Sequence, residues 1–153
     1  MASDPQRMHA APGAAIVVER LDHLVLTVRD LDASCAFYIR VLGMAEERFE
    51  GNRRALRFGN QKLNLHEYGH EISPKATVPT PGSADLCFVV TTPLEAVLAH
   101  LAHCGVVPEL GPVLRTGALG PIQSVYLRDP DGNLIELSHY VSQDHDARGD
   151  ANP

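Results

Sequence analysis

The sequence contains no tryptophan, 5% aromatic residues and three cysteines among 153 residues. An odd number of widely spaced cysteines offers no disulfide framework, and no activator of a reactive thiol is visible beside any of them. We therefore interpret Cys35, Cys87 and Cys104 as small buried residues in a reducing compartment. The lack of tryptophan removes an obvious stacking platform for planar ligands.

Positive charge and long apolar runs are also scarce. Lysine and arginine number 13 against 19 acidic residues, a formal net charge of -6, which argues against nucleic acid as a partner. No apolar run approaches the roughly 20 residues that cross a bilayer, and the N-terminal segment lacks the apolar stretch of a secretory signal. We expect a cytoplasmic protein whose partners are small molecules, with neither nucleic acid nor a membrane among them.

The length suits one domain with a hydrophobic core. Residues 1–15 and 142–153 are polar, small or rich in proline and glycine, and we expect flexible tails there. The folded domain is then predicted at 16–141.

Strand and helix patterns occur in the same order on both sides of a proline-containing linker at residues 69–83. The first module, residues 21–68, predicts a strand at 21–28, a helix at 31–41 and strands at 45–49, 54–58 and 62–68. The second, residues 84–140, predicts a strand at 84–91, a helix at 93–103, strands at 107–110, 124–128 and 134–139, a loop at 110–123 and a tight turn at 129–132.

The second module repeats the first. Residues 22–28 overlay 84–90, a shift of 84 − 22 = 62, which places His23 on Asp85. Residues 63–68 overlay 135–140, a shift of 135 − 63 = 72, which places Asn64 on Glu136. The chain is therefore predicted to be an α+β protein built from two βαβββ modules.

These four repeat-related residues are polar side chains within apolar strands, where burial is costly unless the group is paired or binds something. Residues two apart in a strand share a face, so His66 joins Asn64. Imidazoles with carboxylates suit a borderline divalent metal ion such as Zn, Ni, Mn, Fe or Co. Each of these residues could instead be an ordinary buried or half-exposed polar group; Glu136 is the strongest single candidate.

The predicted loop carries Arg115 and Thr116 between flexible positions, Gly117 and Gly120. It could form a cover whose arginine binds an anionic group of a substrate. A glycine-rich surface connection with a solvated arginine explains the pattern equally well.

Two long segments resemble the vicinal oxygen chelate superfamily, which includes glyoxalase I, extradiol dioxygenases and fosfomycin-resistance enzymes. They are LDHLVLTVRDLDASCAFYIRVLGM at residues 21–44 and DPDGNLIEL at residues 129–137. QKLNLHEYG and GPVLRTGALGPIQSVYLRDPDGN are similar to glyoxalase domain-containing protein 5 and to bacterial virulence-associated glyoxalase-like proteins. The resemblance implies two modules curled into a U-shaped open barrel around a metal cleft, commonly within a homodimer.

The resemblance also implies which residues hold the metal: His23, Asn64, Asp85 and Glu136. His23 and Glu136 match the usual ligands, whereas glyoxalase I has a glutamate in place of Asn64 and a histidine in place of Asp85. We therefore hypothesise a metal site of His23, His66 and Glu136 with Asp85 as a fourth or outer ligand.

In this hypothesis Glu136 or Asp85 also moves a proton, as the catalytic residue. Asn64, Arg115 and Thr116 are left to bind the substrate. The expected function is that of a metal-dependent lyase or isomerase acting on a small oxygenated substrate through bidentate metal chelation. The alternatives are a non-haem iron dioxygenase and a non-catalytic small-molecule binding or resistance protein.

Overall fold

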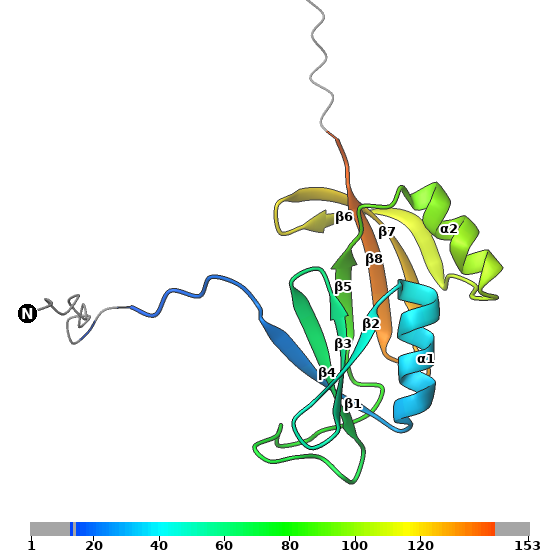
Figure 1. Ribbon diagram of the computed structural model, residues 1–153. Coiled ribbons are helices and arrows are strands. Elements are labelled where there is room, and N and C mark those ends of the chain that lie inside the picture. The colour runs from blue at the N-terminus through cyan, green and yellow to red at the C-terminus, as the bar shows by residue number, and fades with distance from the viewer. Residues whose placement is uncertain (1–12, 14, 143–153) are drawn as a thin grey trace, which may run out of the picture.

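A computed structural model describes residue 13 and residues 15–142, and the chain forms two four-stranded sheets with one helix each (Figure 1). The first module comprises β1 (His23–Val28), α1 (Leu31–Leu42), β2 (Ala45–Phe49), β3 (Arg53–Phe58) and β4 (Gln61–Glu67). The second comprises β5 (Asp85–Val89), α2 (Leu94–His103), β6 (Leu110–Gly117), β7 (Gly120–Arg128) and β8 (Leu134–Tyr140). The predicted tails lie almost wholly outside the described residues.

Strand order and register confirm the internal repeat. The sheets run β1-β4-β3-β2 and β5-β8-β7-β6, and the first-named pair of each is parallel. His23 pairs with Lys62, and Asp85 pairs with Leu134. Adding 62 to residue 23 gives residue 85, and adding 72 to residue 62 gives residue 134. The repeat therefore holds residue by residue. The α+β fold of two βαβββ modules with open, curved sheets is as predicted.

The first helix begins and ends where its capping residues place it. Asp30 accepts a hydrogen bond from the backbone N of Ala33 at 2.9 Å, which satisfies one of the free N–H groups of the first turn. Gly43, with φ of 67°, ends the helix in the left-handed conformation that glycine tolerates. The helix predicted at 31–41 is thus confirmed to within one residue.

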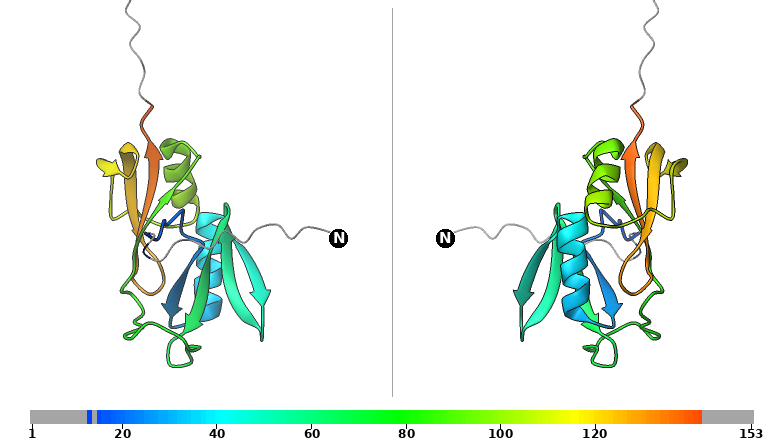
Figure 2. Two further views of the ribbon diagram at one scale, coloured as in Figure 1. Left: turned by 90° about the vertical axis from the view of Figure 1, so that its left-hand side faces the viewer. Right: turned by 90° about the vertical axis from the view of Figure 1, so that its right-hand side faces the viewer.

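Helix-facing residues from both sheets form one hydrophobic core. Leu26 and Val28 of β1 are buried against α1, and Ile135 and Leu137 of β8 belong to the same cluster. Between the modules, Phe58 and Phe88 meet edge to face with ring centroids 5.2 Å apart. The modules are stacked, the second above the first in every view (Figure 2). The opposite face of each sheet stays free of this core.

The turn at residues 129–132 ties the modules together. Asp129 is buried and accepts hydrogen bonds from the Tyr38 hydroxyl at 2.9 Å, from the Asn133 side chain at 2.7 Å and from the backbone N of Asp131 and of Asn133. A buried carboxylate with this many donors is fully compensated. The turn therefore has the structural role that its sequence indicates.

The predicted strand at 107–110 and loop at 110–123 are wrong. Residues of β6 and β7 pair as an antiparallel hairpin, with an irregularity in register between Leu110 and Val113. Glycine and proline at Gly111, Pro112 and Gly117 hid the strand signal, because both residues are depleted in regular strands. The predicted cover is thus part of the second sheet.

Two cysteines also differ from expectation. Cys35 is buried as predicted, but Cys87 is exposed and Cys104 is half-buried; all three are free thiols. Cys87 lies on the face of β5 that points away from the core, where strand alternation places every second residue. Within the described range, no helix is long and apolar enough to span a membrane.

Candidate functional site

Strand β1 turns every second residue away from the core, starting with His23. Leu24, Leu26 and Val28 face the helix side, so His23 lies on the opposite, open face. The His23 Nδ1 atom lies 2.8 Å from Oδ1 of Asp22. A carboxylate only accepts, so Nδ1–H donates and Nε2 is left free. This hydrogen bond lowers the pKa of the Asp22 carboxyl.

Strand β4 adds two buried polar side chains to the same open face. Asn64 pairs with Val25 and His66 pairs with Thr27 across the parallel ladder, and both polar residues are 5% exposed. The Oδ1 atom of Asn64 and the Nε2 atom of His66 are buried without a hydrogen-bond partner among the described residues. Such atoms cost about 1–3 kcal/mol each unless a water or a ligand meets them.

The charge around His66 is mainly positive. Burial lowers the pKa of its imidazole, and the nearby Arg53 lowers it further. Lys75 acts in the same direction, while Glu71 opposes both. The neutral form of His66 is therefore favoured, and it can donate one hydrogen bond and accept one.

Glu136 lies on the open face of the second sheet. It pairs with Cys87 of β5 and with Tyr126 of β7, and Ser138 Oγ donates to its Oε1 at 3.3 Å. Ser138 Oγ also lies 2.7 Å from Ser124 Oγ and 3.2 Å from Cys87 Sγ. This chain of hydroxyls orients the carboxylate of Glu136 without neutralising it.

Cys87 is part of this hydroxyl chain and was not recognised from the sequence as a site residue. Although the residue is exposed overall, partial shielding of its sulfur in the cavity wall raises the pKa of the thiol. Ser138 acts against this increase, and the carboxylates of Glu136 and Asp85 add to it. The thiol is thus held in its protonated, weakly nucleophilic form. The signal was available, because Cys87 follows Asp85 by two residues and so shares its face. Asp85 itself is exposed at the start of β5.

Arg115 is held over this face by an aromatic ring. Its Nε donates to the Tyr126 hydroxyl at 3.1 Å, and its guanidinium carbon lies 5.7 Å from the centroid of that ring. The cavity beneath has a volume of about 390 Å³. Its lining includes Cys87, Arg115, Thr116, Tyr126, Glu136 and Tyr140. The two tyrosines were also missed, although both fall at the alternate positions that share the face of Glu136.

The predicted ligands do not all meet within one chain. Among the described residues, no three His, Cys, Asp or Glu side chains are grouped so that they could hold a metal ion. On the first sheet, His23 pairs with Lys62, which lies four residues before His66 on β4. Four residues span about 13 Å along a strand. Two imidazoles that bind one ion must approach to within about 4 Å of each other, since each nitrogen lies about 2.1 Å from the metal. This offset separates backbone positions, and the side chains of His23 and His66 belong to no such metal-holding group among the described residues.

The two open faces also remain separate from each other. The cavity on the second sheet shares no lining residue with the cavity beside His66 on the first. The sheets meet through helix-facing residues instead, as the Phe58–Phe88 contact shows. One chain therefore presents two separate groups of polar side chains, one with His23 and Asn64 and the other with Asp85 and Glu136.

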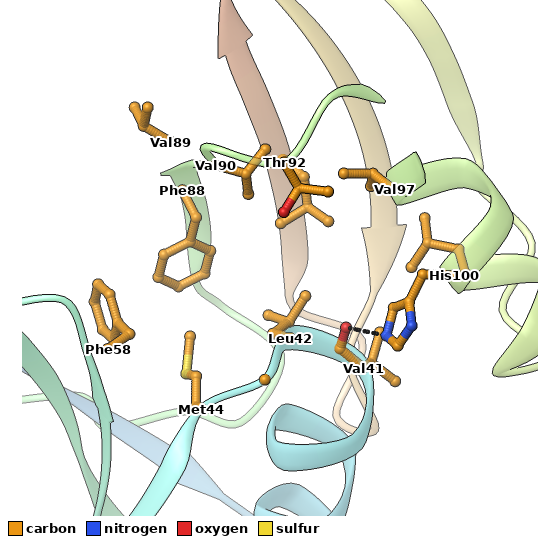
Figure 3. A pocket seen from close by; sticks show the side chains of 13 residues that line it. Val41, Leu42, Met44, Phe58, Phe88, Val89, Val90, Thr92, Val97 and His100 are labelled. Carbon is orange, nitrogen blue, oxygen red and sulfur yellow. Dashed lines mark hydrogen bonds between the residues drawn. The ribbon is translucent and has the colours of Figure 1, made fainter. Parts of the chain in front are cut away.

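A third cavity lies between the modules and has a different character. Its volume is about 430 Å³, and its walls are mainly apolar (Figure 3). Figure 3 shows Phe58, Phe88 and Met44 along one side and His100 on the other, where the His100 Nε2 atom lies 3.0 Å from the Val41 carbonyl oxygen. None of the predicted site residues lines it, so it is not the polar site.

Known proteins similar to this chain share this architecture. The sequence profile of the Glyoxalase/Bleomycin resistance protein/Dioxygenase superfamily matches residues 20–137. Virulence protein STM3117 of Salmonella typhimurium is 53% identical over 126 residues, 82% of this chain and 88% of that protein. Its crystal structure superposes with a TM-score of 0.81 and is covered completely.

Two further relatives come from other organisms. Glyoxalase domain-containing protein RDO1 of Mycosarcoma maydis is 54% identical over 123 residues, 80% of this chain and 69% of that protein. Biphenyl-2,3-diol 1,2-dioxygenase 3 of Rhodococcus globerulus is 31% identical over 132 residues, 79% of this chain and 63% of that protein. The chain belongs to the glyoxalase/bleomycin resistance protein/dioxygenase superfamily.

Proposed function

We propose that this protein is a metal-dependent lyase or isomerase that acts on a small oxygenated substrate. The observation that carries the proposal is the hydrogen bond between His23 Nδ1 and Asp22 at 2.8 Å. Metal-binding histidines usually donate their second ring nitrogen to a carboxylate or carbonyl, which fixes the tautomer and raises the basicity of the free nitrogen. His23 carries this arrangement on the open face of an edge strand.

The remaining ligands are proposed to come from a second copy of the chain. Both β1 and β5 are edge strands of their sheets, and edges of this kind pair readily with another chain. If β1 of one copy lies beside β5 of the other, His23 faces Asp85 and Glu136 of the second copy. Imidazole nitrogen with two carboxylates is a donor set that borderline divalent metals accept.

An exposed apolar segment supports the homodimer. Residues 15–22, which we call the arm, are extended and lie outside any helix or strand (Figure 1). Ile16, Val17 and Val18 of the arm are 93%, 88% and 81% exposed. Three successive exposed aliphatic residues next to an open sheet edge favour contact with a partner of the same kind.

When bound, the metal ion would chelate two neighbouring oxygens of the substrate and stabilise negative charge on them. Glu136 is the residue proposed to move the proton, a role supported by the hydrogen bond from Ser138 to one of its carboxylate oxygens, which leaves the other oxygen free. The buried Oδ1 of Asn64 lacks a partner and can accept from a substrate hydroxyl. Arg115, braced on Tyr126, can pair with an anionic group.

A non-haem iron dioxygenase is the second candidate, favoured by the 31% identity to the Rhodococcus globerulus dioxygenase. Histidine and carboxylate ligands also suit ferrous iron. Consumption of oxygen that depends on added ferrous iron would distinguish this candidate, whereas a lyase or isomerase consumes none.

Metal content tests the proposal. The protein should be stripped with a chelator, dialysed against Zn, Ni, Mn, Co or ferrous iron, and analysed for bound metal. We expect about one ion per chain in the wild type and a loss of at least tenfold in affinity in His23→Ala or Glu136→Gln. His70→Ala and Glu67→Gln, in exposed residues nearby, serve as matched controls and should bind as the wild type does. Failure of the wild type to bind any of these metals would overturn the proposal.

A further inference from the structure

The connection between the modules covers part of the open face of the first sheet. Pro74, Lys75, Ala76 and Pro79 of this connection close a cavity of about 270 Å³ with residues of β1 and β4. The strand residues that line it are Val25, Thr27 and His66. A segment predicted as a simple linker thus forms one wall of a pocket.

The pocket has one polar end that lacks a partner. His66 is 5% exposed, and its Nε2 atom is buried with no hydrogen-bond partner among the described residues. Thr27, its register partner on β1, is also buried and lines the same cavity. A buried imidazole nitrogen is rarely left unpaired in a folded protein, so this atom is available to a ligand that enters the pocket.

The charges beside His66 favour an anion. Lys75 lines the pocket, and its Nζ lies 3.4 Å from Glu71, whose side chain is 6% exposed. Arg53 lines a smaller cavity on the other side of His66 and approaches a carboxylate, that of Glu50, only to 4.0 Å. Lys75 is the charged residue in the pocket lining beside His66, and Arg53 adds positive charge from the other side, opposed by the carboxylates of Glu71 and Glu50.

The other walls are apolar. Val25, Pro74, Ala76 and Pro79 offer no charged group to a ligand. A pocket of this size with a cationic end and an apolar body matches a short-chain carboxylate better than a phosphate or a sugar, which expose polar groups on all sides.

We propose that this pocket binds the carboxylate end of a small organic acid. The Nε2–H of His66 donates to one carboxylate oxygen, and Lys75 pairs with the other. The short aliphatic part of the ligand lies against Val25 and the two prolines. Binding of such an acid stands on the pocket alone and does not need a metal ion.

The further step, that this acid is also the substrate of the enzyme, rests on the proposed function. His66 and Asn64 lie two residues apart on the face that also carries His23. A ligand with its acid group at His66 would extend towards Asn64 and His23, where its oxygens could be chelated. The substrate class would then be a small carboxylic acid with further oxygens remote from the acid group.

Binding of butyrate to the chelator-treated full-length protein tests the pocket without metal or turnover. Chemical shifts of the His66 ring in NMR spectra would be followed as sodium butyrate is added, and then butyramide, its neutral analogue. We expect saturable shifts with butyrate and binding at least tenfold weaker with butyramide. Lys75→Met should weaken butyrate binding about tenfold, while Lys62→Met, which removes a cation that lies over Phe49 on the same face, should leave it unchanged.

Two variants separate this inference from the proposed function. His23→Ala should lose metal but bind butyrate as the wild type does, whereas His66→Phe should lose butyrate. His66→Phe alters a buried position and could disturb the fold. Lys75→Met, at the partly exposed rim, therefore gives a second, independent test of butyrate binding. Absence of saturable butyrate binding, equal binding of butyramide, or indifference to Lys75→Met would each overturn the inference, and water alone would then occupy the site at His66.

Discussion

Buried polar side chains in this protein fall into two kinds. Asp129 and Asn133 are buried and hydrogen-bonded on every side, and they connect the last turn to α1. Asn64 and His66 are as deeply buried, yet each keeps a polar atom without a partner in the part of the chain that the structure describes. The first kind stabilises the fold, and the second kind costs stability that binding of a ligand would return.

Removal of the Tyr38 hydroxyl should show how much a fully hydrogen-bonded buried side chain, that of Asp129, stabilises the fold. Tyr38→Phe keeps the ring in its buried position but deletes the donor to Asp129. A hydrogen bond to a charged group contributes about 1.5–3 kcal/mol, so we expect the free energy of unfolding, measured by urea denaturation, to fall by that amount. Tyr68→Phe, at an exposed tyrosine, should change it by less than about 0.5 kcal/mol. An equal effect of the two substitutions would contradict the assigned role of Asp129.

Asparagine-to-leucine substitutions should distinguish buried polar side chains that are hydrogen-bonded from those that keep an unpaired atom. Asn64→Leu removes an unpaired amide oxygen, so the unfolding free energy should stay level or rise by up to about 1 kcal/mol. Asn133→Leu removes hydrogen bonds to Asp129 and to the backbone N of Ala84, and the same quantity should fall by at least about 2 kcal/mol. Thermal denaturation of both variants is the measurement; a large loss of stability in Asn64→Leu would mean that its amide is structural.

At the scale of elements, the β6–β7 hairpin positions Arg115. Gly111 lies in the register irregularity of β6 with φ of 114°, and a Cβ atom there would come too close to the Ser124 carbonyl oxygen, at 2.4 Å. Ser124 in turn touches Ser138, which orients Glu136. The hairpin that carries Arg115 is thus connected to the carboxylate of Glu136 through the close approach of Gly111 to Ser124 and the hydroxyl contacts of Ser124 and Ser138.

Gly111→Ala should therefore destabilise the second sheet. Overpacking of this kind costs about 1–3 kcal/mol, added to the strain of a positive φ. Gly59→Ala has a positive φ of 51° but nothing within 4 Å of its Cβ, so it measures the backbone strain alone. Chemical denaturation should show Gly111→Ala to be less stable than Gly59→Ala by at least about 1 kcal/mol; the reverse order would refute the close approach.

Elements with regular patterns were predictable from the sequence, and irregular ones were not. The cap at Asp30 and the glycine at Gly43 bound α1 as predicted, and the predicted internal repeat reappears in the registers of β1 and β5 with their partners. Glycine and proline concealed β6, because pairing with β7 overrode local propensity.

For the site, the sequence predicted which residues share one face of a sheet. It did not predict which faces of the two sheets meet. His23, Asn64 and Glu136 lie on the open faces, as strand alternation requires. Whether two faces converge depends on how the modules stack, which is decided by contacts such as Phe58 with Phe88. These contacts join residues far apart in the chain and have no local signature. Cys87 was misassigned as buried for the same reason, since an apolar sequence context does not say which face is covered.

At the scale of the whole molecule, the arm is the feature that one chain leaves without a partner. Val17→Asp places a charge in the middle of its apolar run. Burial of one valine is worth about 1.5–3 kcal/mol, so the dissociation constant of the proposed dimer should rise at least tenfold. Analytical ultracentrifugation over a range of concentrations measures this change.

The matched control lies at the other end of the molecule. Val107 is 85% exposed. It lies in the connection between α2 and β6, and Figure 1 shows α2 on the opposite side of the molecule from the arm. Val107→Asp should leave the dimer unaffected. A wild-type protein that is monomeric at micromolar concentration, or a Val17→Asp variant that associates as the wild type does, would contradict the role of the arm.

The proposed metal site combines His23 of one copy with Glu136 of another, and complementation between subunits tests this pairing. His23→Ala and Glu136→Gln chains, each unable to hold metal alone, would be mixed, dissociated and reassociated before metal analysis. Random pairing makes half of the dimers mixed, and a shared two-fold interface gives each mixed dimer one intact site. We therefore expect recovery of about a quarter of the wild-type metal content. Recovery of none, while the wild type binds metal fully, would show that each site lies within a single chain and would rule out a site shared between copies.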